Sequence, residues 1–167
     1  MRVYLPATLA MLRQLVDSGE LAPVSGTGFA LTPMLRESYA AGNTEELEYA
    51  AMMEAARASL RLLSAELDAD PKVPARRVVV AADVEGVRLR PDLDTAAVTV
   101  PGTVPVTAIA AVHVDVAAAE EAVRASAAVV HAADLGDPDA EFALGDAEDH
   151  EMAWYAPQEL PFLLELL

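Results

Sequence analysis

Several stretches of the chain show the alternating or unbroken apolar patterns that are typical of β-strands. The clearest is RRVVVAADV at 76–84, because an unbroken apolar run favours a strand that is buried on both faces and central in its sheet. The other candidate strands are RVYLPA at 2–7, GTGFALT at 26–32, TAIAAVHVDV at 107–116 and HEMAWYA at 150–156.

Elsewhere apolar residues recur every three or four positions, which predicts helices. Thr8, Thr32 and Asn43 each precede such a segment, and side chains of this kind cap the first turn of a helix. Gly19 is placed to end the first helix. The longest helix is expected from Asn43 to 67, with an apolar stripe of Tyr49, Met52, Met53, Ala56, Leu60, Leu63 and Leu67. Another is expected from about 116 to 131, and a short apolar one at the C-terminus.

The longest uncharged stretch is TAAVTVPGTVPVTAIAAV at 95–112. Its prolines, glycine and threonines argue against a membrane-spanning helix. Pro101 and Gly102 suit the two central positions of a type II turn, so we expect two short strands joined as a hairpin. DLGDPDAE at 134–141 has the composition of a loop.

These elements predict one α/β (α+β) domain over residues 1–167. We expect two layers, with a mixed sheet of about five strands and helices mainly on one face. Each end of the chain repeats the order strand, helix, strand, proline, helix. This internal pattern favours a ferredoxin-like duplication with the strand at 76–84 added to it.

The net charge is −16, with 27 acidic and 11 basic residues, so the surface repels nucleic acids and anionic membranes. The chain has no cysteine, which excludes disulfides, thiolate catalysis and cysteine zinc sites. Lys72 is the only lysine and no phosphate-binding loop is present, which excludes Walker-type nucleotide hydrolysis. The N-terminal segment lacks the features of a signal peptide, so we expect a cytoplasmic protein.

Candidate chemistry centres on DAEDHE at 146–151, where Asp149, His150 and Glu151 are acid–base candidates. Carboxylates and imidazole also suit a divalent transition metal, but neighbouring residues cannot all face one ion. Asp149 and His150 would need His113 and Asp115, which lie on one face of the VHVD strand. The alternative is a charged loop before a buried strand, with Asp149 or His150 binding backbone groups there.

Two apolar features indicate binding surfaces. Trp154 and Tyr155 point to opposite faces of a strand, so one is expected in the core. The other, with Tyr4, can line a shallow pocket or a partner surface. The last helix either folds back on the domain or forms a homodimer through Phe162, Leu163, Leu164, Leu166 and Leu167.

Four segments together resemble a family of uncharacterised actinobacterial proteins, a domain of unknown function. They are MRVYLPATL, ELEYAAMMEAARASLRLL, RRVVVAADV and EDHEMAWYAPQELPFLL, and they span almost the whole chain. The resemblance implies an intracellular protein and carries over no catalytic residue. We therefore expect a non-catalytic binding or regulatory protein without a cofactor, which self-associates and recognises a protein or small ligand. The alternative is a metal-assisted hydrolase that uses the His/Asp cluster.

Overall fold

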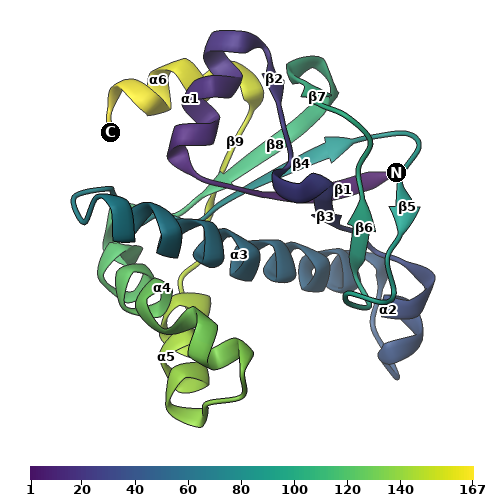
Figure 1. Cartoon of the computed structure of the whole chain (residues 1–167). Coiled ribbons are helices and arrows are strands. Elements are labelled where there is room, and N and C mark those ends of the chain that lie inside the picture. The colour runs from purple at the N-terminus through teal and green to yellow at the C-terminus, as the bar shows by residue number, and fades with distance from the viewer.

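The computed structural model describes residues 1–167, which form a single α/β domain around one large sheet (Figure 1). In chain order the elements are β1 (Arg2–Ala7), α1 (Leu9–Ser18), β2 (Glu20–Leu21), η1 (Val24–Gly26), β3 (Thr27–Phe29), α2 (Pro33–Ser38), α3 (Thr44–Ala69), β4 (Val78–Asp83), β5 (Arg88–Leu89), β6 (Ala97–Thr99), β7 (Val104–Pro105), η2 (Val106–Ala108), β8 (Ile109–Val114), η3 (Ala117–Ala119), α4 (Glu120–Asp134), α5 (Pro138–Glu148), β9 (Ala153–Tyr155), η4 (Pro157–Glu159) and α6 (Leu160–Glu165), where η denotes a 3₁₀ turn. The expected fold class is confirmed.

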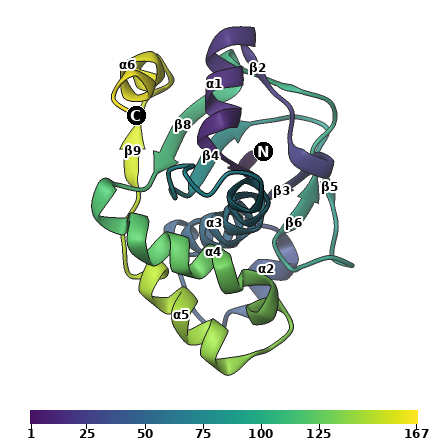
Figure 2. The ribbon, with the colours of Figure 1, turned by 60° about the vertical axis from the view of Figure 1, so that its left-hand side comes forward.

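The sheet has seven strands in the order β5-β6-β3-β1-β4-β8-β9, and β2 and β7 form a separate two-stranded ribbon. The sheet is therefore larger than the expected five strands. It is also not mixed, because every pairing is antiparallel. β4 lies between β1 and β8, as its unbroken apolar run predicts. β9 pairs with β8 alone and forms one edge of the sheet (Figure 2).

Helices cover both faces of the sheet, which corrects the expected two-layer arrangement (Figure 1). On one face α1 and α6 bury Leu12 and Leu163 against residues that include Leu5 and Val80. On the other face α3 packs against Tyr4, Phe29, Val79 and Ala81. Both faces of β1 and β4 are apolar, so each face needs its own cover.

A third apolar cluster joins α3 to α4 and α5, which lie beside it on the side away from the sheet (Figure 2). Leu63 of α3, Val123 and Val130 of α4 and Leu144 of α5 are buried there. The segment expected to be a loop at 134–141 therefore contains the start of a helix. Asp137 caps this helix, because its carboxylate accepts hydrogen bonds from the backbone N–H groups of Asp139 and Ala140.

The expected helix caps at Thr8, Thr32 and Asn43 are confirmed, since each side chain accepts a backbone hydrogen bond from the first turn. Gly19 ends α1 with φ of 80°, a conformation that glycine adopts without steric cost. None of the helices combines the length and the hydropathy that crossing a bilayer needs.

The apolar stripe expected along α3 is correct only in its second half. Leu60 and Leu63 are buried, but Tyr49 is exposed and Met52 is half-buried. Ala51 and Ala55 are buried instead. Small side chains fit here because α3 packs directly on the large Tyr4 and Phe29 rings.

Two expectations about strand pairing are wrong. The strands on either side of Pro101 and Gly102 do not form a hairpin, because β6 pairs with β3 and β5 whereas β7 pairs with β2. The expected repeat is only approximate, because β2 lies between α1 and β3 and two helices, α4 and α5, lie between β8 and β9. The flanking strands are direct antiparallel neighbours: β1 beside β3, and β8 beside β9. A ferredoxin-like sheet would place another strand between them, so the fold is not a duplication of that type.

Candidate functional site

The acidic segment 146–151 begins inside a helix and ends in a linker. Asp146 lies in the last turn of α5, which ends at Glu148, and Asp149 is the residue that caps its end. His150 and the exposed Glu151 then lead into β9. The loop that we expected is therefore helical over its first half.

Asp149 and His150 both line a shallow groove of about 470 Å³ between α4 and the end of α5. Asp146 and Glu121 line the same groove, together with Ala118, Ala122 and Ala125. The structure thus brings together two of the four candidate metal ligands and two further carboxylates. Glu151 does not line this groove.

Asp115 does not line this groove and forms a buried ion pair with Arg77. Both Asp115 carboxylate oxygens accept hydrogen bonds from the Arg77 guanidinium, at 2.8 Å from Nε and 2.9 Å from Nη2. The Arg77 backbone N–H donates to the same carboxylate at 2.7 Å. Arg77 Nη2 also donates to the carbonyl oxygen of His150 at 3.1 Å, which fixes the linker before β9. Both oxygens of the Asp115 carboxylate are therefore bound by Arg77.

His113 lies in β8 between Val79 of β4 and Trp154 of β9. Burial lowers the pKa of its imidazole, which favours the neutral form. The metal candidates are therefore divided among the sheet, the buried ion pair and the groove. No group of three or more histidine, aspartate or glutamate side chains is arranged to hold a metal ion.

Tyr4 is buried under α3 and does not contribute to a surface with Trp154. Its hydroxyl donates a hydrogen bond to Glu48 at 3.2 Å. Burial, and then the nearby Glu48 carboxylate, raise the pKa of Tyr4 to about 12. β4 and β8 separate β1 from β9, which places the two strands roughly 14 Å apart.

The two aromatic residues of β9 lie on opposite faces, as the alternation predicts. Tyr155 packs against the core that α1 and α6 cover, whereas the Trp154 side chain is 60% exposed. Beside β9 lies an open hollow of about 500 Å³ lined by Val106, Thr107, Ile109, Ala110, Ala156, Pro157 and Gln158. None of these side chains is charged, although the net charge of the chain is −16.

The C-terminal helix α6 folds back on its own domain. Leu163 and Leu164 are buried in the core beside α1, and Leu167 packs against it. Only Phe162 and Leu166 of the expected dimer residues remain largely exposed, at 70% and 85%. A dimer that used all five side chains would require α6 to leave its own domain.

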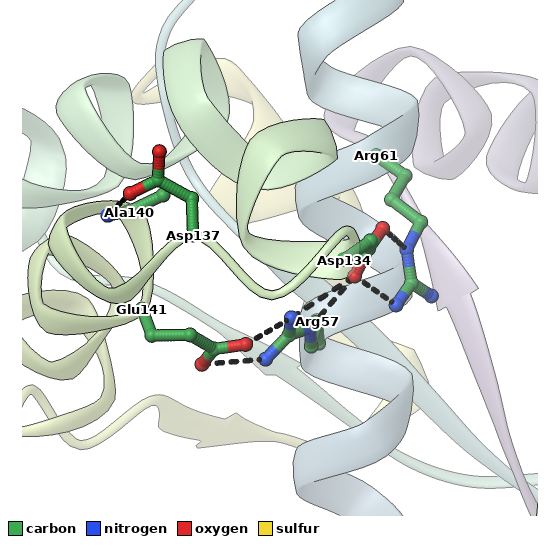
Figure 3. Close-up of polar contacts among 6 residues, drawn as sticks. All are labelled: Arg57, Arg61, Asp134, Asp137, Ala140 and Glu141. Atoms are coloured by element: carbon green, nitrogen blue, oxygen red, sulfur yellow. Dashed lines mark hydrogen bonds and ion pairs between the residues drawn. The ribbon is translucent and has the colours of Figure 1, made fainter.

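A cluster of charges that the sequence patterns did not indicate joins α3 to α4 and α5 (Figure 3). Arg57 binds Glu141 at 2.8 Å and Asp134 at 3.0 Å, and Arg61 binds Asp134 at 2.7 Å. These arginines lower the pKa of both carboxyl groups, mainly by hydrogen bonding. The spacing of Arg57 and Arg61, four residues apart on one helix face, was the available signal.

A second hollow that the sequence did not indicate lies between α2, β5 and β6, with a volume of about 240 Å³. Thr32, Glu37 and Thr95 are its polar wall residues. The Thr32 hydroxyl is already bonded to the Thr95 carbonyl and to the Leu35 N–H. The Thr32 hydroxyl is therefore not free to bind a ligand in this hollow.

Comparison with known proteins gives one match. The profile of a protein family, described as a family of unknown function (DUF6912), matches residues 1–164. No curated protein and no solved structure is detectably similar to the chain.

Proposed function

The chain belongs to this family of unknown function (DUF6912), which assigns no activity, and we propose that it is a non-catalytic binding protein. Its recognition surface is the edge of the sheet at β9, and it accepts an extended strand of a protein partner. The cytoplasmic location expected from the sequence is part of the same proposal.

The observation that carries this proposal is the open edge of β9. An edge strand has backbone N–H and C=O groups on one side that no neighbour within the sheet can bind. A partner strand pairs with such groups, and its side chains fit the pockets next to the edge. The uncharged hollow beside β9 and the exposed Trp154 supply the apolar contacts that such binding requires.

The opposite edge of the sheet does not have these properties. β5 is two residues long, carries Arg88 and is followed by the ion pair of Arg90 with Asp92. Charged side chains on an edge strand discourage pairing with another chain. The contrast supports β9 as the binding edge.

The alternative function, a metal-assisted hydrolase, has weaker support. It needs His113 and Asp115 beside Asp149 and His150, but the Asp115 carboxylate is bound on both oxygens by Arg77. The groove that holds Asp149 and His150 contains only one imidazole.

A peptide-display selection on the immobilised protein tests the proposal. We expect the selected peptides to bind in extended form at β9 and to shift the fluorescence of Trp154, the only tryptophan in the chain. Trp154→Lys should weaken their binding by about tenfold or more, because it removes an aromatic anchor. Phe142→Lys is the matched control, since Phe142 is an 80% exposed aromatic residue on α5.

Selected peptides that bind the Trp154→Lys variant as tightly as the wild type would place recognition elsewhere on the molecule. The proposal would also be abandoned if repeated selections enriched no peptide on the wild-type protein relative to the Trp154→Lys variant. Circular dichroism of both variants tests whether they remain folded.

A further inference from the structure

We infer that the strand accepted at this edge is β9 of a second copy of the chain, paired antiparallel to the first about a twofold axis through Trp154. This inference rests on the proposed function and names the partner that the edge binds. It also moves the self-association surface from α6, where the sequence suggested it, to the sheet edge.

Symmetry favours pairing between identical edge strands. Two copies of one strand that pair antiparallel are related by a twofold axis, so a single surface serves both partners. With the axis at Trp154, each tryptophan faces its equivalent and Ala153 faces Tyr155. Aromatic side chains directly opposite each other across an antiparallel pair are close enough to stack, which removes Trp154 from water.

The distribution of charge restricts where two copies can meet. Two bodies of net charge −16 repel each other, so they can meet only where few charges lie. No residue from 152 to 158 is charged, and neither is any wall of the neighbouring hollow. The groove beside Asp149 and the hollow beside Thr32 both contain charged side chains.

The antiparallel direction keeps the acidic segments apart. Residues 146–151 precede β9, so in a parallel pair the two acidic segments would lie side by side. In the antiparallel pair they lie at opposite ends, and the two Glu151 residues are about 20 Å apart for a strand rise of ~3.4 Å per residue. That distance is roughly twice the Debye length at 0.1 M salt. Each acidic end instead approaches the uncharged Pro157 and Gln158 of the other copy.

The strand pair extends into a larger contact. β9 itself has only three residues, which is too short for a stable interface by backbone hydrogen bonds alone. Ala156, Pro157 and Gln158 follow the strand, with Pro157 beginning the 3₁₀ turn η4, and they line the uncharged hollow together with residues of η2 and β8. The uncharged surface therefore reaches beyond the strand on its C-terminal side in each copy.

The experiment measures mass by light scattering over a range of protein concentrations, together with the emission of Trp154. We expect a dimer that dissociates on dilution, with emission at longer wavelength as Trp154 returns to water. Trp154→Lys should be monomeric throughout the range, and Phe142→Lys should match the wild type. A third variant, Phe162→Lys with Leu166→Lys, tests α6 and is expected to dimerise like the wild type.

The outcomes separate this inference from the proposed function. If the protein is monomeric at all concentrations and the Trp154 emission is constant, the inference that a second copy is the partner is wrong. Selected peptides that still bind at β9 would then leave the proposed function intact. A dimer that survives Trp154→Lys but is lost in the α6 variant overturns the inference and assigns the interface to α6. Failure of both dimerisation and peptide binding removes both proposals.

Discussion

At the scale of single residues, the buried pair of Arg77 and Asp115 is the contact whose loss should cost most. Their side chains are 1% and 0% exposed, and the pair joins the start of β4 to the end of β8. We expect Asp115→Ala to lower the free energy of unfolding by about 3–5 kcal/mol, because it leaves an uncompensated guanidinium in the interior. Denaturant unfolding followed by circular dichroism measures this loss.

The control for that prediction is the Arg2–Asp83 pair, which has a similar length of 2.9 Å but exposed side chains. Asp83→Ala should cost less than about 1 kcal/mol, because solvent screens an exposed ion pair. Equal losses in the two variants would show that burial does not determine the contribution of the Arg77–Asp115 pair.

The sequence could not predict the Asp115 contact. Asp115 lies with His113 on one face of the VHVD strand, which made it a candidate metal ligand. Its partner Arg77 lies 38 residues earlier, and only the register of β4 against β8 brings the two together. That register depends on side-chain packing over the whole sheet, whereas local patterns predict only which face a residue occupies. The opposite orientations of Trp154 and Tyr155 were predictable for that reason.

At the scale of elements, α4 and α5 are attached to α3 by the apolar cluster and by the Arg57, Arg61, Asp134 and Glu141 side chains (Figure 3). We expect Arg57→Ala to weaken this attachment by about 1 kcal/mol, since the ion pairs are only partly buried. Amide hydrogen exchange, measured by mass spectrometry, should become about fivefold faster in α4 and α5 and remain unchanged in β1 and β4.

The same attachment should weaken in acid. The folded chain lowers the pKa of Asp134 and Glu141 below the ordinary 3.8 and 4.5, so these groups bind protons less readily than in the unfolded chain. Their stabilising effect is therefore present above these values and is lost as the pH falls through the lowered ones. Exchange in wild-type α4 and α5 should then approach that of Arg57→Ala. The control is Arg88→Ala, which removes an exposed arginine from β5 and should leave exchange in α4 and α5 equal to that of the wild type at each pH. An equal increase of exchange in the sheet on acidification would contradict the assignment of the effect to Asp134 and Glu141.

Helices with an unambiguous capping signal were predictable, and strand pairs whose partners are distant were not. α1, α2 and α3 begin where Thr8, Thr32 and Asn43 indicate. α5 was missed because Asp137, Pro138 and Gly145 are typical of loops, although Asp137 and Pro138 also suit a helix start. The Pro101–Gly102 hairpin was wrong because the strands on either side of the turn each find another partner in the sheet.

At the scale of the whole molecule, the sequence predicts the fold class but not the order of the strands. Patterns of period two and three to four locate the main strands and helices, and they show that β4 needs cover on both faces. They do not say which strand lies beside which, so the pairing of β1 with β3 and of β8 with β9 required the structure. The candidate site failed for a different reason: β8 does pair with β9, but His150 lies outside that pairing and the Asp115 carboxylate is bound by Arg77.

The net charge of the molecule leads to a prediction about salt. Two copies of charge −16 repel each other at long range, and the proposed β9 interface contains no charged side chain. Raising the ionic strength from about 0.01 M to 0.15 M shortens the Debye length from about 30 Å to about 8 Å, so it screens the repulsion without weakening any attraction at the interface. We therefore expect the dissociation constant of the dimer to fall several-fold, with a shift of Trp154 emission to shorter wavelength at fixed protein concentration.

Phe142→Lys should follow the same trend, and Trp154→Lys should stay monomeric at both ionic strengths. An interface built on ion pairs would respond in the opposite direction, so a dissociation constant that rises with salt would exclude the uncharged β9 edge as the contact between copies.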